Sequence, residues 1–449
     1  MKFGLSVPFR TLLNAESEQL SIHRVEAARQ LEKAFQPVSE SSDVVEVEVL
    51  EPSVDDTKRG LKTLSDDSVP WFCRSLAKVT LSSAYFDKAK HALSEIYDGP
   101  EWKAAIAGLE LTGFVECFDN TLAVGSFEGQ IDLSEIPQSV SATAFERFLS
   151  DLAERAVEPF NNDILAGPLE ALSKGHIGAK HSFTRPKQAY EIFSDLNEHA
   201  YPGWNDSIPA FFWAHRVYVL DDAIRQSPEA AQLLRLDDIN AFGTRVKDDC
   251  TLHVGSSVVG EAGMVAEFLR SCAISQYFYC LFDILNSNQN RLYREIASKP
   301  SMKLMKRSIR KYNRMENFID YTGNELSNAE ISFQGTRRVL FDGLNRVFGT
   351  RQLIEAVCKR DELVQSRLQR RSFLLQRADR RTLQLVIFLL GAAQLLSLVV
   401  DLFDFSGESR TFQVPGAYDL FRWMDFNITM HVAIVLVLAG AFYATIKRE

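Results

Sequence analysis

The sequence predicts an α+β cytoplasmic domain followed by a long stalk helix and two C-terminal transmembrane helices. Two runs of nineteen residues near the C-terminus carry no charge, which is typical of membrane spans. Thirteen of the fourteen prolines lie at or before Pro300, so long uninterrupted helices are expected after it. These patterns predict an α+β domain at 1–260, a helical region with the stalk at 261–381 and a transmembrane domain at 382–449.

The composition is typical of a folded chain of two or three structural units. The chain has 449 residues, of which 46% are hydrophobic and 24% charged. Its net charge of −9 argues against a nucleic-acid partner, because such proteins need excess Lys and Arg against phosphates. Its six cysteines form no C-x-x-C pair and are expected to be reduced core residues. Because residues 1–10 lack a signal-peptide apolar core, the N-terminal part is expected in the cytoplasm.

Short strands and an amphipathic helix are predicted in the N-terminal part. The strand candidates are residues 44–50, 113–118, 121–133, 211–220 and 251–259. The second and third of these indicate a hairpin around Asp119 and Asn120. Residues 141–157 place apolar side chains at helical spacing after Ser141, which is typical of an N-capped helix. The mixture favours an α+β domain.

The pattern turns helical at 261–296 and stays helical after residue 301. Residues 351–402 contain nothing that breaks a helix, which predicts a stalk about 78 Å long. Apolar residues recur along its first part at Ile354, Val357, Val364, Leu368 and Leu375. Because Asp361 interrupts this seam, we expect the stalk to pack against neighbouring helices rather than form a two-stranded coiled coil.

The two charge-free runs are residues 382–400 and 428–446, each about 28 Å long as a helix. Six arginines precede the first run, and Lys447 and Arg448 follow the second, whereas the loop at about 401–427 is acidic. Positive flanks face the cytoplasm. The sequence therefore predicts a multi-pass integral membrane protein with both termini cytoplasmic and an outer loop between the spans.

One face of the first predicted span is polar. On a helical wheel, Gln384, Ile387, Gly391, Gln394, Leu398 and Asp401 fall within an arc of about 100°. This polar face is expected either to line a pore, with Asp401 and Asp404 forming carboxylate rings at the outer mouth, or to hydrogen-bond to other helices. Arg377, Arg380 and Arg381 are expected either to gate that pore from the cytoplasm or to contact lipid headgroups and set the topology.

The layout resembles the CorA-like divalent cation transporter family. The resemblance is carried by residues 252–259, by the helix with Gln276-Tyr277-Phe278-Tyr279 and 281–286, and by the stalk, within about the last 200 residues. It implies a homo-oligomer, as a pentamer, whose first spans line a pore and whose cytoplasmic domain senses cations. The family's Gly-Met-Asn signature is absent, since the chain reads Asp-Leu-Phe-Asp-Phe-Ser-Gly at 401–407. No filter residue can therefore be transferred from the family.

The sequence contains acidic residues that could bind a metal ion, but their spacing matches no specific metal-binding motif. Five Asp-Asp doublets begin at positions 55, 66, 221, 237 and 248. Clustered carboxylates suit a hard divalent cation such as magnesium, but Asp also caps helices. The metal ligands stay unassigned, and no other cofactor is expected.

The sequence therefore gives two functional expectations. The first is a CorA-like oligomeric membrane protein that acts as a cation channel or transporter gated by its cytoplasmic domain. The alternative is a membrane-anchored cytoplasmic sensor or effector without ion selectivity. The expected partners are membrane lipid and further copies of the chain. An enzyme is not expected, because the chain lacks a phosphate-binding Gly-rich loop, G-x-S-x-G and H-E-x-x-H.

Overall fold

The computed structural model describes residues 1–11, 13, 24–49, 75–118, 121–137, 139–174, 211–247, 249–298, 302–408, 425, 427–428, 431–432 and 434–435. The chain divides into two compact units. Unit 1 comprises residues 1–299 and 306–364, and unit 2 comprises residues 300–305 and 365–449. Each unit is described by itself below.

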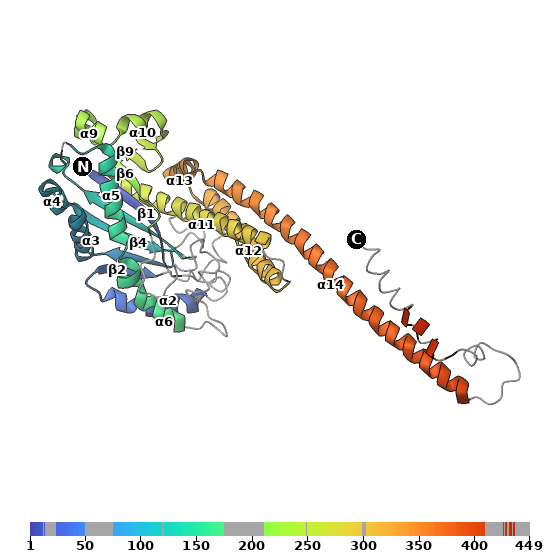
Figure 1. Ribbon diagram of the computed structural model, residues 1–449. Coiled ribbons are helices and arrows are strands. Elements are labelled where there is room, and N and C mark those ends of the chain that lie inside the picture. The colour runs from blue at the N-terminus through green and yellow to red at the C-terminus, as the bar shows by residue number, and fades with distance from the viewer. Residues whose placement is uncertain are drawn as a thin grey trace. The chain divides into compact units, whose positions relative to one another are not determined.

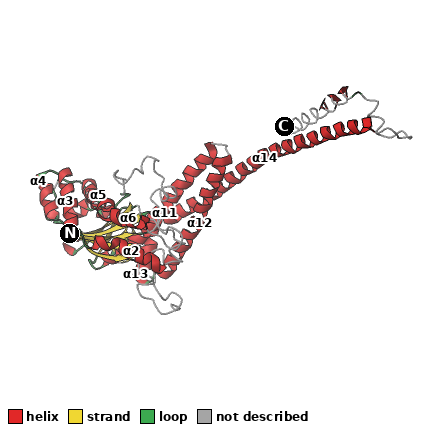
Figure 2. Cartoon of the chain, turned by 90° about the horizontal axis from the view of Figure 1, so that it is seen from below, coloured by secondary structure: helices red, strands yellow, loops and turns green. Residues whose placement is uncertain are grey.

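Unit 1 is built on a mixed β-sheet. The strands are β1 (Lys2–Arg10), β2 (Val44–Val49), β3 (Ala77–Leu81), β4 (Glu110–Cys117), β5 (Leu122–Gln130), β6 (His215–Val219), β7 (Thr244–Lys247), β8 (Cys250–Leu252) and β9 (Ser256–Val259). They form a nine-stranded sheet within the described residues, in the order β2-β3-β4-β5-β1-β6-β9-β8-β7. The pair β6–β9 is parallel, and the other neighbouring strands of this described sheet pair antiparallel. Figure 2 distinguishes these strands, in yellow, from the helices, in red.

Shorter helices of unit 1 lie between the strands along the chain. They are α2 (Arg24–Ser39), α3 (Ser83–Ile96), α4 (Pro100–Ala107), η3 (Leu133–Glu135), α5 (Ala142–Val157), the π-helix η4 (Phe160–Leu165), α6 (Ala166–Lys174), α8 (Asp222–Gln226), α9 (Pro228–Leu233) and α10 (Leu236–Phe242). Four longer helices follow: α11 (Met264–Ser298), α12 (Met302–Ser332), α13 (Gly335–Phe348) and α14 (Thr350–Glu408). Figure 1 labels most of these elements.

Strand β1 is central in the sheet and buried on both faces. Phe3, Leu5, Val7 and Phe9 alternate along it and join the larger hydrophobic core, in which the ring of Phe9 packs edge-on against Phe160 of η4. The intervening residues face α11, since Ser6 hydrogen-bonds to Gln276 of that helix. A strand covered on both faces loses the alternation of apolar and polar residues. For this reason the sequence pattern did not predict β1.

Helix α11 packs closely against the sheet at Gly4. A Cβ atom at that position would lie 2.7 Å from Cγ1 of Val217 and 3.0 Å from Cγ1 of Val265. The absence of a side chain therefore permits the close approach of α11 to β1 and β6. A second hydrophobic cluster joins α11 and α13 to strands β6, β8 and β9.

Several elements predicted from the sequence are confirmed. Strand β2 begins at Val44 as expected, and β4 pairs with β5 from Glu110↔Gln130 to Cys117↔Ala123. Asp119 and Asn120, at the expected hairpin turn, lie outside the described residues. Ser141 caps α5 by accepting a hydrogen bond from the backbone N–H of Ala144 at 3.2 Å.

The single strand predicted at 251–259 is wrong in detail. The range holds β8 and β9, which pair antiparallel around a turn that includes Gly255 at φ 82°. A left-handed residue favours glycine and reverses the chain, so an apolar run can contain a turn. Strands β3 and β7 were also not predicted.

The first part of α14 packs against α11 and α12, as the interrupted seam predicted. Val357 and Val364 are fully buried. The backbone carbonyl of Val357 accepts a hydrogen bond from Gln289 of α11, and Asp361 is bonded to Tyr312 of α12. The helix predicted at 351–402 is confirmed as part of α14, which runs from Thr350 to Glu408.

The membrane part of the predicted fold is wrong. Across the described residues, the structure has no helix with both the length and the apolar character needed to cross a bilayer. This finding contradicts the transmembrane helix predicted at 382–400, and with it the predicted two-helix transmembrane domain at 382–449 and the assignment as a multi-pass integral membrane protein. Of the second predicted span, 428–446, only residues 428, 431–432 and 434–435 are described. Within the described residues the first run is part of α14, which continues from Thr350 to Glu408.

The loop predicted at about 401–427 is also corrected at its start, because α14 remains helical to Glu408. In the second charge-free run and just before it, the described helical residues are 427–428, 431–432 and 434–435. Most of that run, including its C-terminal end at residue 446, lies outside the described residues. The acidic side chains of the range therefore do not mark the end of the first helix.

Candidate functional site

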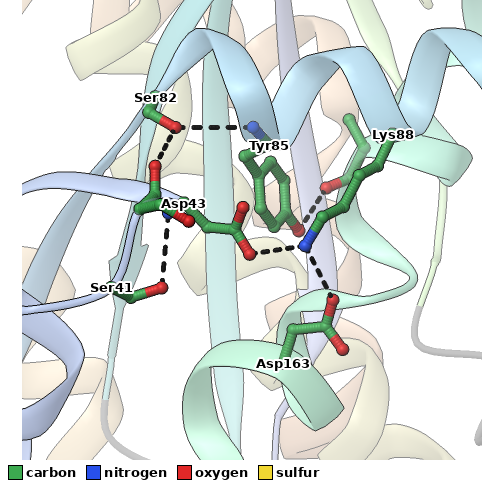
Figure 3. Close-up of polar contacts among 8 residues, drawn as sticks. Ser41, Asp43, Ser82, Tyr85, Lys88 and Asp163 are labelled. Atoms are coloured by element: carbon green, nitrogen blue, oxygen red, sulfur yellow. Dashed lines mark hydrogen bonds and ion pairs between the residues drawn. The ribbon is translucent and has the colours of Figure 1, made fainter.

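A polar cluster in unit 1 joins three elements that are distant in the sequence (Figure 3). Ser82 begins α3: its hydroxyl accepts a hydrogen bond from the backbone N–H of Tyr85 at 3.4 Å and donates to the carbonyl of Ser42 at 2.7 Å. One turn later, Lys88 reaches Asp43, just before β2, and Asp163 of the π-helix. We call Asp43, Tyr85, Lys88 and Asp163 the Lys88 cluster.

Within the Lys88 cluster the pKa values of Lys88 and Tyr85 are both raised. Nζ of Lys88 lies 2.5 Å from Oδ2 of Asp43 and 3.8 Å from Oδ2 of Asp163. The hydrogen bond to Asp43 raises the pKa of Lys88. Burial raises the pKa of Tyr85 well above its usual value, and the charges of Asp163 and Asp43 add to that effect. Its phenol donates to the carbonyl of Ala156 at 2.9 Å.

These groups favour binding over proton transfer. A protonated ammonium is a poor nucleophile, and a neutral phenol with a raised pKa is a poor base. The Lys88 cluster therefore acts as a clamp between α3, the start of β2 and η4. One element of the clamp, η4, is a π-helix, and π-helical turns are frequent at functional sites.

A second candidate residue is Glu116 of β4, whose pKa is shifted. It pairs with Lys78 of β3 in the sheet. Burial raises the pKa of Glu116 to about 7, although the positive charges of Lys78, Arg270 and Arg337 oppose the shift. Glu116 is the single charge in the predicted strand at 113–118, and that isolation is the sequence signal that could have identified it.

A buried polar seam lies where α11 meets the sheet. Nε2 of His215 is 2.9 Å from Oγ of Ser257, and both side chains are fully buried. Burial lowers the pKa of His215 to about 3, so the imidazole is neutral. The ring stacks on Phe268 and meets Phe348 edge-on. This enclosure by a hydroxyl and two aromatic rings is typical of a structural histidine.

The residues of the predicted polar face all lie on α14. Gln384, Ile387, Gln394, Leu398 and Asp401 are exposed in the single chain, and Gly391 is half-buried. Asp404, Arg377, Arg380 and Arg381 also lie on α14, but their side chains are outside the described part. The structure thus places these ten residues on one helix and does not test their role in a pore.

Large apolar side chains are exposed on the same part of α14. We call this set the α14 stripe: Leu383, Val386, Ile387, Leu389, Leu390 and Leu398. At 100° per residue they fall within about 180° of the helix circumference. Between 47% and 61% of each residue's surface is exposed. An apolar patch of this kind marks a surface that another molecule covers.

The predicted metal ligands are not brought together in the described part of the chain. That part contains no group of three or more His, Cys, Asp or Glu side chains suited to a metal ion. Asp221 instead caps α8, accepting from the N–H of Ile224 at 2.8 Å, and Asp237 and Asp238 lie in the first turn of α10. The doublets at 55 and 66 are outside the described residues.

The chain matches no protein-family model, no curated protein and no solved structure. The resemblance to CorA-like transporters therefore stays a prediction. The same holds for the cation transport and magnesium binding that it implied.

Proposed function

We propose that this chain is a homo-oligomeric sensor or effector. In this proposal unit 1 receives the signal, and copies of the chain assemble through the α14 stripe. The observation that carries the proposal is the exposure of six large apolar side chains on one side of α14.

A second copy of α14 is the partner that the spacing supports best. Leu383, Ile387, Leu390 and Gln394 follow one another at intervals of four, three and four residues. Alternation of three and four is typical of helices that pack along one another through a shared seam. A polar residue in such a seam, here Gln394, favours one register and one number of strands.

A glycine beside the seam supports close helix packing. Gly391 lies about 80° from Leu383 around the helix, and a Cβ atom added to it would meet no described atom within 4 Å. Short side chains allow two helix backbones to approach closely. Asp401 is one heptad beyond Gln394, where repeated carboxylates in an assembly would repel one another. The seam is therefore expected to be tightest at 383–394.

Unit 1 supplies the features expected of a receiving domain. The Lys88 cluster joins three elements through ion pairs, one of them to Asp163 of the π-helix η4, and Glu116 has a pKa of about 7. Groups of this kind change their interactions when a charged ligand arrives or when the pH changes. The chemical identity of the signal is left open.

The assembly is tested by measuring the molar mass of the purified full-length chain over a dilution series. Light scattering after gel filtration is expected to give a multiple of 50.7 kDa at high concentration, with dissociation on dilution. A mass of one chain at every concentration would overturn the proposal. So would a chain that is monomeric alone and is recovered only with phosphatidylcholine vesicles.

A further inference from the structure

The helical bundle of unit 1 contains an acidic group between α12 and α14. The hydroxyl of Tyr312, on α12, lies 3.0 Å from Oδ2 of Asp361 on α14 and 3.2 Å from Oε1 of Glu316. Tyr312 is buried, with 4% of its surface exposed, whereas Asp361 is half-buried and its Oδ1 atom is covered. The phenol can donate to only one of the two carboxylates at a time.

Helix α11 contributes Gln289 to the same place. Its side chain is fully buried, its Nε2 donates to the carbonyl of Val357 at 3.1 Å, and its amide also faces Asp361. Neither Oε1 of Gln289 nor Oδ1 of Asp361 has a hydrogen-bond partner among the described atoms. Two acceptors left without a donor in a bundle are costly, and a single proton shared with them would remove that cost.

The charged and titratable groups around Asp361 favour a proton there. From α12 it faces Tyr312, Glu316 and Asp320, and from α11 the neutral Gln289. On α14, Cys358 and Glu362 lie within a turn, and Arg360 donates to Asn286 of α11 at 2.5 Å. Burial raises the pKa of Asp361, Glu316 and Asp320 raise it further, and the bonds from Tyr312 and Gln289 oppose the shift.

We propose that Tyr312, Asp361 and Gln289 form a proton-binding latch that tightens the packing of α12 and α14 as the pH falls. Asp361 takes one proton from solvent at its carboxylate. The resulting O–H group at Oδ1 can donate a hydrogen bond to Oε1 of Gln289. Oδ2 of Asp361 still accepts the hydrogen bond from the hydroxyl of Tyr312. Deprotonation returns the buried charge and loosens the bundle. The latch is a regulation of unit 1 and does not depend on the α14 stripe.

The sign follows from the direction of the pKa shift. Because the pKa of Asp361 in the folded chain lies above its ordinary value of 3.8, the folded state binds the proton more tightly than the unfolded state does. The stabilisation is complete below the unfolded pKa and is lost as the pH rises through the folded pKa. Within that window, bundle opening changes by up to about tenfold per pH unit.

Hydrogen–deuterium exchange of the full-length chain tests the latch. Peptides from α12 and the first part of α14 are expected to exchange more slowly at pH 4.5 than at pH 7, after correction for the intrinsic rate. Asp361→Asn carries a neutral amide and is expected to remove this pH dependence and to protect the bundle at pH 7. Glu355→Gln, an exposed carboxyl on the same helix, is the matched control and should keep the wild-type profile.

A second variant guards against a folding defect at Asp361. Asp320 is exposed, and Asp320→Asn removes one of the charges that raise the pKa of Asp361. This variant should shift the exchange transition to lower pH without abolishing it. A wild-type profile that is flat from pH 4.5 to 7 would overturn the latch. A pH dependence that persists unchanged in both Asp361→Asn and Asp320→Asn would also overturn it.

Discussion

Replacing Ile387 and Leu390 with glutamate is expected to weaken self-association by at least about 100-fold. These residues are 60% and 61% exposed in the single chain. Complete burial of such a side chain stabilises by about 1.5–3 kcal/mol, so covering the exposed three fifths contributes about 1–2 kcal/mol each. Two side chains per copy give about 2–4 kcal/mol, and the two copies of a dimer together give about 4–8 kcal/mol. This exceeds the 2.8 kcal/mol that corresponds to about 100-fold in the dissociation constant. Buried carboxylates would add to the loss.

Sedimentation velocity over a dilution series measures this change. The double variant is expected to sediment as a single chain at concentrations where the wild type is assembled. Leu363→Glu is the matched control for Leu390→Glu, because Leu363 is 59% exposed on α14 but lies outside the stripe. Circular dichroism should show the same helix content in all variants. Equal dissociation constants for wild type and double variant, or an equal loss in Leu363→Glu, would refute the reasoning.

Three further predictions concern the stability of unit 1. Glu116→Gln should raise the free energy of unfolding above pH 7 by up to about 3 kcal/mol, because the folded pKa near 7 exceeds the ordinary 4.5 and the wild type loses stability as the pH rises through 7. Urea titrations at pH 5 and 8 check this, and an equal effect at both would contradict it. Tyr85→Phe should cost about 1–2 kcal/mol, since the carbonyl of Ala156 loses a buried donor. Ser141→Ala should cost about 1 kcal/mol through loss of the α5 cap, measured by thermal unfolding; no change would argue against that cap.

The sequence could predict the helices and strands that have one buried and one exposed face, because apolar and polar residues then alternate with a regular period. Helix α5 and the β4–β5 hairpin belong to this class, because periodicity and turn residues both mark them. Strand β1 does not, since both its faces are covered and Ser6 contacts a helix 270 positions away. Local patterns contain no information about that distant contact.

Among the residues of the candidate sites, some had a local signal in the sequence and others did not. Asp361 was visible in the sequence as the residue that interrupts an apolar seam, and the structure supplies the reason in Tyr312 and Gln289. Lys88, Asp43 and Asp163 lie on three separate elements, and no spacing in the sequence brings them together. Glu116 had a weak signal, a single carboxyl in an apolar strand, but its neighbours Lys78 and Arg270 come from other elements.

The membrane prediction shows what a charge-free run does and does not indicate. Residues 382–400 carry no charge, and Leu383, Ile387 and Leu390 among them are exposed in the single chain. Exposed apolar side chains of this kind favour contact with another apolar surface. Hydropathy indicates that a segment favours an apolar environment, but it does not distinguish membrane lipid from a partner helix. Spacing carries additional information, because intervals of three and four residues indicate a seam for a partner helix. Helices that pack within a membrane use the same spacing, so the seam indicates a helix partner and not its surroundings. Mutations that keep the hydropathy of residues 382–400 but move the apolar residues off the seam therefore separate the need for an apolar environment from the need for a partner helix. These variants are expected to dissociate the assembly.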